Sequence, residues 1–275
     1  MDSAVLQHPA LKWRAGNATT VGDNLAVEEP LEIRLGGRRF TLTMRTPGHD
    51  EELAAGFLLA EGFIASRDEL GEIRRVRDGK GLPEPNVIDV ILKVAAHDLS
   101  ERLKRNFTIS ASCGVCGKTS IEALERRIAP ITSDLRIAAA TMLRLPAMMR
   151  EAQAVFSRTG GLHAAALFAR LNGAEAAAMM VLREDIGRHN AVDKVIGHAL
   201  ELDRIPLHDA VMMVSGRLSF EIIQKAAAAG IPLVAAVSAP STLAVELAQE
   251  LGITVVGFLR EQSFNVYTHD QRVVV

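Results

Sequence analysis

Cysteine is scarce in this chain, and neither sign of charge is in excess. Two cysteines in 275 residues are too few for the disulfide framework of a small secreted protein. The 31 basic and 33 acidic side chains give a net charge of −2, which argues against a general nucleic-acid binder and a basic membrane-surface protein. We therefore expect neither nucleic acid nor a membrane among its partners.

Long apolar runs are also missing. The longest uncharged apolar stretch, residues 231–245, is interrupted by Pro232 and Pro240 and falls short of the roughly 18 residues of a membrane span. The N-terminal residues lack a basic segment followed by an apolar one, so the sequence predicts no secretory leader. These absences favour a cytoplasmic protein.

The composition that remains is that of an ordinary globular protein, with 48% hydrophobic and 23% charged residues. The length suits one large or two modest domains with a sizeable core. We divide the chain into an N-terminal tail (1–22), a β-rich region with one helix (23–105) and an α/β domain (106–275).

The β-rich region opens with a predicted hairpin. Residues 31–35 and 39–45 alternate between apolar and polar side chains. Gly36-Gly37 between them allows a tight turn, and the alternation gives the hairpin one apolar face. Asp50 is placed to cap the helix that follows.

Beyond about residue 106, apolar strand-like segments alternate with helical ones. This alternation predicts a mostly parallel sheet that is covered by helices on both faces. The expected strands are residues 107–111, 177–182, 210–214, 232–237 and 253–259. The expected helices include one that opens at Pro146 and ends at Gly160-Gly161, followed by residues 189–203, 218–229 and 241–251.

Both cysteines lie in one glycine-flanked segment, residues 112–117, between an expected strand and an expected helix. The helix N-terminus and Lys118 both favour the thiolate, which is the reactive form of cysteine. Three chemistries fit Cys113 and Cys116: a dithiol–disulfide couple, half of a zinc site, or a sulfur carrier that holds a persulfide. A pair of incidental, buried small side chains is the fourth interpretation.

The histidine nearest in type to a zinc-deaminase motif lacks its catalytic partner. Zinc deaminases combine His-x-Glu with Pro-Cys-x-x-Cys, and the glutamate moves the proton. Here Ala165 stands two positions after His163, and no proline precedes Cys113. The sequence therefore argues against deaminase chemistry and we expect no structural metal. His163 either starts a helix packed against the core or contacts a ligand.

A charged segment, residues 183–194, follows one of the apolar strands and opens a helix. Ligands bind at the carboxyl ends of strands in open α/β sheets. We therefore take Arg188 and His189, at this strand-to-helix junction, as candidate ligand contacts.

Two further strand-to-helix turns, residues 215–219 and 238–242, carry small hydroxyl side chains, and the first also carries Arg217. With Arg260 at the end of the last expected strand, they predict a rim suited to a phosphorylated ligand. The sequence contains neither a P-loop nor a Rossmann glycine motif.

Taken together, these motifs resemble the formate dehydrogenase accessory sulfurtransferase family, and they occur in order over nearly the whole chain from about Asp23. Such a set is far more specific than a Cys-x-x-Cys alone. The matching segments are residues 44–48, 52–58, 112–117, 159–165, 184–194, 215–217, 256–260 and 265–268.

The resemblance implies a cytidine-deaminase-like layered α/β fold without deaminase chemistry, and a cytoplasmic homodimer. It implies a sulfurtransferase that accepts persulfide sulfur from a cysteine desulfurase. The sulfur passes to a bound substrate, the molybdenum bis(molybdopterin guanine dinucleotide) cofactor, which the formate dehydrogenase apoenzyme needs. Cys113 would carry the persulfide with Cys116 assisting. The residues implied to line the cofactor site are Phe258, Leu259, Arg260, Glu261, Gln262 and Ser263.

The rim of strand-end residues fits such a substrate, because each guanine dinucleotide carries a pyrophosphate that Arg217 and Arg260 suit. Arg188 and His189 would orient the ligand or stabilise the persulfide anion. Three alternatives stay open: a dithiol oxidoreductase, a non-enzymatic cofactor-binding chaperone, and a protein with structural zinc.

Overall fold

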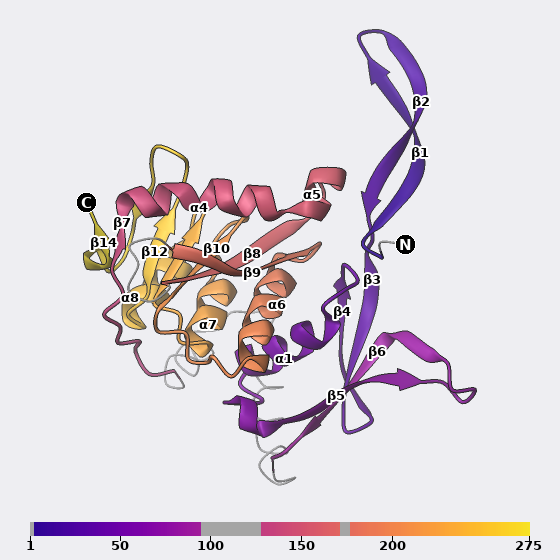
Figure 1. The fold of residues 1–275 in the computed structure, drawn as a ribbon, viewed down its shortest axis with the longest axis horizontal. Helices are drawn as coiled ribbons and strands as arrows, with labels where there is room; N and C mark the ends of the chain where they lie inside the picture. The colour runs from indigo at the N-terminus through magenta and orange to yellow at the C-terminus, as the bar shows by residue number, and fades with distance from the viewer. Residues whose placement is uncertain (1–2, 95–127, 171–176) are drawn as a thin grey trace.

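The structure, a computed structural model, describes residues 3–94, 128–170 and 177–275 (Figure 1). The strands of its largest sheet are β8 (His163–Arg170), β9 (Ala177–Asp185), β10 (Ala210–Val214), β11 (Leu233–Ala236), β12 (Thr254–Gly257) and β13 (Asn265–Val266). The helices around this sheet are α4 (Ala139–Ala152), α5 (Ala154–Thr159), α6 (Arg188–Glu201), α7 (Phe220–Ala228) and α8 (Thr242–Glu250). The strand order is β13-β12-β11-β10-β8-β9.

Strand directions in this sheet are mixed. The β10–β11 and β11–β12 pairs are parallel, whereas β12–β13, β10–β8 and β8–β9 are antiparallel. The prediction of a mostly parallel sheet is therefore wrong, because an apolar run reports burial on both faces and not the direction of a strand. His163 begins β8 and does not start a helix, so that interpretation is also wrong.

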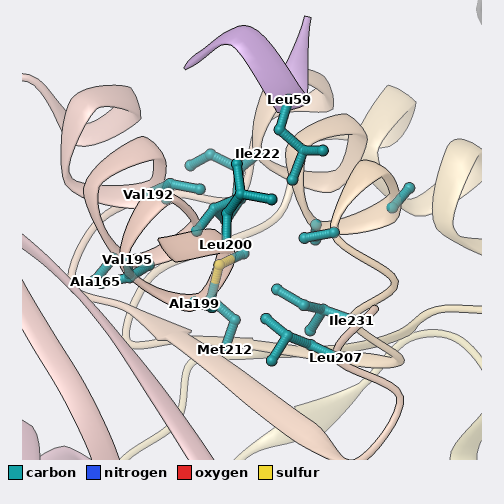
Figure 2. Close-up of a cluster of buried hydrophobic side chains, with 14 of the residues drawn as sticks. Leu59, Ala165, Val192, Val195, Ala199, Leu200, Leu207, Met212, Ile222 and Ile231 are labelled. Atoms are coloured by element: carbon teal, nitrogen blue, oxygen red, sulfur yellow. The ribbon is translucent and has the colours of Figure 1, made fainter. Parts of the chain in front are cut away.

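Helices cover both faces of the sheet, as predicted: α4 and α5 lie on one face, and α6, α7 and α8 lie on the other (Figure 1). Successive side chains of β10 point to opposite faces. Met212 packs in the cluster formed with α6 and α7, which Figure 2 shows, whereas Met213 packs in the cluster that contains Met142 of α4. Pro146 lies inside α4 and does not open it, because the buried residues of this helix begin before the proline.

A second sheet carries the N-terminal part of the chain. Its strands are β3 (Glu29–Leu35), β4 (Arg38–Arg45), β5 (Leu70–Arg77) and β6 (Pro83–Leu92), in the order β4-β3-β6-β5, with α1 (Asp50–Ala60) and the short 3-10 helix η1 (Arg67–Glu69) between β4 and β5. The predicted hairpin is confirmed, with positive φ angles of 58° at Gly36 and 82° at Gly37.

Two local expectations for this region are wrong. Leu42 pairs with Glu32 and is 62% exposed, so the apolar face is complete on β3 and not on β4. Asp50 is the first residue of α1 and does not cap it. Its carboxylate instead accepts a hydrogen bond from Arg45 Nε at 2.9 Å, because a buried arginine needs a buried partner.

The N-terminal region and the large sheet share one hydrophobic core, and α1 crosses α6 at two glycines. A Cβ atom added at Gly197 would lie 1.8 Å from the carbonyl oxygen of Glu52, and one added at Gly56 would lie 1.8 Å from that of Asp193. The two backbones meet because neither glycine carries a side chain. This contact fixes α6, the helix that the charged segment opens, against the N-terminal region.

Residues that the sequence places in a tail form a regular hairpin. Strand β1 (Val5–Arg14) pairs antiparallel with β2 (Asn17–Ala26), and this arm stands away from the rest of the molecule (Figure 1). The sequence gives no clear signal for it, because apolar and polar side chains share both faces. At the other end of the molecule, β7 (Ile137–Ala138) pairs with β14 (Val273–Val274), next to the 3-10 helix η2 (Asp270–Arg272).

Within the described ranges, no helix combines the length and the apolar character needed to cross a membrane.

Candidate functional site

A cavity of about 760 Å³ opens between α4, α5 and the strand ends of the large sheet. Its lining includes Phe156 from α5, His163 from the start of β8, Ser215 directly after β10 and residues 259–261, which follow β12. The volume falls within the range of small-molecule sites, roughly 300 to 1,000 Å³. The lining mixes apolar side chains with a few arginine, glutamate and histidine groups, which is typical of a site that fixes the orientation of a polar ligand.

The wall formed by α5 is held by a carboxylate from the charged segment. Glu184 accepts hydrogen bonds from the backbone amides of Val155 at 2.9 Å and Phe156 at 2.7 Å. These are N-terminal amides of α5, which have no acceptor within the helix. The helix ends at Gly160, which has a positive φ of 67°. Glu184 therefore sets where the Phe156 side of the cavity lies.

The next residue, Asp185, is fully buried and joins three parts of the chain. Its carboxylate contacts Lys194 Nζ at 2.7 Å and accepts hydrogen bonds from the amide of Thr46 at 3.2 Å and that of Gly187 at 2.8 Å. It also accepts one from Asn190 Nδ2 at 3.0 Å. Asp185 thus ties the loop before α1 to the start of α6.

Arg188 and His163 approach each other beside Gly216. A Cβ atom added at Gly216 would lie 3.5 Å from His163 Nδ1 and 3.8 Å from Arg188 Cδ, so both side chains converge on the space that this glycine leaves open. Arg188 Nε is buried and has no hydrogen-bond partner among the described residues. Burial, followed by the positive charges of Arg188 and His189, lowers the pKa of His163.

An unpartnered buried guanidinium nitrogen at a helix start is an arrangement that suits an anion. The N-cap of α6 is Gly187, which provides no side-chain acceptor for the first amides of the helix. Those amides and the positive end of the helix dipole favour a negatively charged group.

His189, the other candidate in this segment, contacts α7. Its Nε2 lies 2.8 Å from Glu221 Oε2 and 3.3 Å from Ser219 Oγ. The hydrogen bond from His189 lowers the pKa of Glu221. His189 is therefore held at the junction of α6 and α7, next to Arg188 in sequence.

The predicted segment 258–263 reaches the cavity through three of its residues, Leu259, Arg260 and Glu261. Leu259 is fully buried and belongs to the apolar wall. Arg260 donates hydrogen bonds to the carbonyl oxygens of Val237 and Leu259, which holds its guanidinium at the end of β11.

The remaining predicted residues lie around the cavity or outside the described part of the chain. Phe258 is 44% exposed, and Gln262, Ser263 and Arg217 are exposed as well, but they are not in the cavity lining. Cys113 and Cys116 lie outside the described residues, so the structure does not test the predictions made for them.

Sequence reasoning missed the far wall of the cavity. Arg150, Glu151 and Phe156 line it, with the Arg150 guanidinium carbon 4.4 Å from the centre of the Phe156 ring. It also missed the role of Glu184, although the charged segment itself was singled out. No local pattern in the sequence indicates this role, because the amides that Glu184 binds are 28 and 29 residues away in the chain.

An α/β protein with a small-molecule cavity at its strand ends, beside an open helix N-terminus and an unpaired guanidinium nitrogen, has the features of a binder of anionic ligands. The comparisons identify the family. The FdhD/NarQ family model matches residues 26–274, and the chain belongs to this family. The resemblance stated from the sequence motifs is confirmed.

Curated relatives match over most of their own length. The chain is 53% identical over 263 residues to the sulfur carrier protein FdhD of Mycolicibacterium paratuberculosis, covering 94% of this chain and 95% of that protein. It is 47% identical over 270 residues to the sulfur carrier protein FdhD of Streptomyces coelicolor, covering 96% and 94%. Among solved structures, a formate dehydrogenase accessory protein from Desulfotalea psychrophila matches with a TM-score of 0.75 and 27% identity, covering 98% of this chain and 100% of that one.

Proposed function

We propose that this protein is a sulfur carrier in the maturation of formate dehydrogenase. It accepts persulfide sulfur from a cysteine desulfurase and transfers it to the molybdenum bis(molybdopterin guanine dinucleotide) cofactor. The observation that carries this proposal is the family match over residues 26–274, which include both cysteines, together with relatives of 47–53% identity that are named sulfur carriers.

The first transfer uses Cys113 as the nucleophile. Its thiolate attacks the outer sulfur of the desulfurase persulfide, a bond forms between the two sulfurs, and the desulfurase cysteine leaves as a thiolate. Cys113 then holds the persulfide. The thiolate is the attacking form of cysteine, and the helix start expected near Lys118 would favour it.

The second transfer needs two electrons, because persulfide sulfur is at a higher oxidation level than a sulfide ligand. Cys116 supplies them when its thiolate attacks the inner sulfur of the Cys113 persulfide. A disulfide forms between the two cysteines, and hydrosulfide is released to the metal. A dithiol reductant then restores both thiols. In this scheme Cys113 carries the sulfur and Cys116 releases it.

The cavity beside β8 and β12 is where we place the cofactor as a bound substrate. The pyrophosphate groups would lie near Arg188, whose Nε has no partner among the described residues, with His189 holding the α6–α7 junction. Leu259, Arg260 and Glu261 line this cavity. Phe258, Gln262, Ser263 and Arg217 would contact the parts of the substrate that extend beyond it.

As the partners we propose a cysteine desulfurase as sulfur donor and the formate dehydrogenase apoenzyme as the acceptor of the cofactor. We further propose that the protein is cytoplasmic and works as a homodimer. A cofactor-binding chaperone without sulfur transfer is the second candidate, because the cavity by itself accounts for binding.

Complementation of a strain that lacks this gene separates the two functions. We expect Cys113→Ala to abolish formate dehydrogenase activity while binding of guanosine diphosphate stays unchanged. Cys116→Ala should retain sulfur loading but lose activity. Normal activity in the double variant would exclude sulfur transfer and support the chaperone. Loss of guanosine diphosphate binding in Cys113→Ala would mean that the cysteine acts through the site and not through sulfur.

A further inference from the structure

The break between α4 and α5 leaves a buried amide side chain in the wall of the cavity. Gln153 directly follows α4 and is the N-cap residue of α5. It is 5% exposed and lines the cavity. Its side chain makes no capping hydrogen bond, and within the described ranges neither its amide nitrogen nor its amide oxygen has a partner. Buried polar groups are nearly always hydrogen-bonded, so this amide indicates a ligand that pairs with it.

Glu184 explains why Gln153 is not needed as a helix cap. An N-cap side chain normally accepts a hydrogen bond from the second or third amide of its helix. In α5 these amides belong to Val155 and Phe156, and the Glu184 carboxylate accepts from both, at 2.9 and 2.7 Å. The side chain of Gln153 is therefore left for whatever binds in the cavity.

The residues on either side of Gln153 form a flat surface in the same wall. The guanidinium carbon of Arg150 lies 4.4 Å from the centre of the Phe156 ring, and both residues line the cavity. Guanidinium planes and aromatic rings both stack on heteroaromatic rings. This wall therefore suits a planar ring, and Gln153 lies midway in the chain between the two stacking residues, where its amide can contact the edge of that ring.

The polar groups of the wall select among planar rings. An amide side chain donates and accepts, so it pairs with a ring carbonyl and the adjacent ring N–H, or, after a flip, with the edge of adenine. Glu151 and Glu261 line the same cavity, and a carboxylate accepts from an amino group beside that N–H. One donor followed by two acceptors matches the 2-amino-4-oxopyrimidine edge, which guanine and pterin share and adenine lacks.

We propose that Gln153 is a specificity residue of this cavity, where it binds the 2-amino-4-oxopyrimidine edge of a ring stacked on Arg150 and Phe156. This inference rests on the proposed function, whose substrate carries that edge in both its guanine and its pterin rings. It adds the residue that recognises the ring, whereas the arginines of the rim would hold the phosphates.

Gln153→Met tests the proposal, because methionine keeps the length and shape of the side chain and removes its hydrogen bonds. The matched control is Gln249→Met, because Gln249 is exposed on α8, on the opposite face of the large sheet (Figure 1). Calorimetry measures the binding of guanosine diphosphate and of 6-hydroxymethylpterin. Their comparators are adenosine diphosphate and 2,4-diamino-6-hydroxymethylpteridine, which lack the carbonyl and the ring N–H.

We expect Gln153→Met to weaken the binding of guanosine diphosphate, of 6-hydroxymethylpterin or of both by about tenfold or more, because it removes two hydrogen bonds. The comparators, and every ligand of Gln249→Met, should stay within about twofold of the wild type. The ligand that is weakened identifies the ring that occupies the site. The unfolding temperature of Gln153→Met should be unchanged or higher, because an apolar group replaces an unpaired buried amide.

Unchanged affinity of Gln153→Met for both edge-bearing ligands would overturn the proposal, as would equal weakening of a ligand and its comparator. A lower unfolding temperature of this variant would overturn it too, because the amide would then be paired within the protein. A wild type that binds neither edge-bearing ligand would also overturn it. Sulfur loading of Cys113 is measured separately, so none of these outcomes decides whether the protein carries sulfur.

Discussion

The crossing of α1 and α6 makes a direct prediction for Gly197→Ala. The new Cβ would lie 1.8 Å from the backbone oxygen of Glu52, whereas real Cβ contacts stay above 3.0 Å, so one helix must move by about 1 Å. Overpacking of a core costs about 1–3 kcal/mol, and we expect the upper end because the clash is with backbone. Replacing glycine by alanine inside a helix stabilises it by only about 1 kcal/mol. The clash costs more than this gain, so the substitution should lower the free energy of unfolding.

Urea unfolding measures this change, with Gly79→Ala as the control. Gly79 is exposed, and a Cβ there meets nothing within 4 Å, so the control should stay within about 0.5 kcal/mol of the wild type. We expect Gly197→Ala to lower the free energy of unfolding by about 2–3 kcal/mol. A loss below about 0.5 kcal/mol would refute the close crossing of the two helices.

Three other features of the structure, the Asp185–Lys194 pair, the Glu52 carboxylate and the space beside Gly216, each make a prediction. Asp185→Asn leaves the buried Lys194 ammonium without its carboxylate and should cost about 3–5 kcal/mol in urea unfolding; a loss under 1 kcal/mol would contradict this role. Burial opposes ionisation of Glu52, but hydrogen bonds from Arg183 and His49 outweigh it and lower its pKa to about 2 from 4.5. The stabilisation that ionised Glu52 gives the folded state is fully present above pH 4.5 and is lost as the pH falls toward 2. The wild type should therefore lose about 2 kcal/mol over that window relative to Glu52→Gln, after allowance for solvent screening, and parallel pH profiles would exclude this. Gly216→Val places methyl groups between His163 and Arg188, so calorimetry should show at least about tenfold weaker binding of guanosine diphosphate with little change in unfolding. Unchanged affinity for guanosine diphosphate would show that the space between His163 and Arg188 is not part of the binding site.

The sequence predicted local elements better than the way they are assembled. The strands at 210–214 and 232–237 and the helices at 189–203, 218–229 and 241–251 lie within a few residues of β10, β11, α6, α7 and α8. Apolar runs and helix-capping residues are local signals, so they indicate strands and helices whatever the tertiary arrangement is. Strand direction depends on the pairing partner, which is why the antiparallel β8–β9 hairpin was missed.

The same distinction applies to the site. The charged segment after β9 was singled out because ligands bind at the carboxyl ends of strands in open α/β sheets. Two of its carboxylates organise the structure there: Glu184 holds the cavity wall, and Asp185 holds the start of α6. The contacts that tie these carboxylates to other parts of the chain, Glu184 to the amide of Phe156 and Asp185 to that of Thr46, span 28 and 139 residues. Spacing alone does not encode such contacts. Arg150 and Phe156 belong to no recognisable sequence motif, and only the folded structure places them in the cavity wall.

Sulfur transfer by this protein depends most on Cys113 as the carrier. Mass spectrometry of the protein after incubation with a cysteine desulfurase and cysteine tests it on the peptide of residues 106–118, which lies between Arg105 and Lys118. We expect a gain of one sulfur atom in the wild type and in Cys116→Ala, and none in Cys113→Ala. A sulfur adduct that persists in Cys113→Ala, or a wild type that gains none, would contradict it.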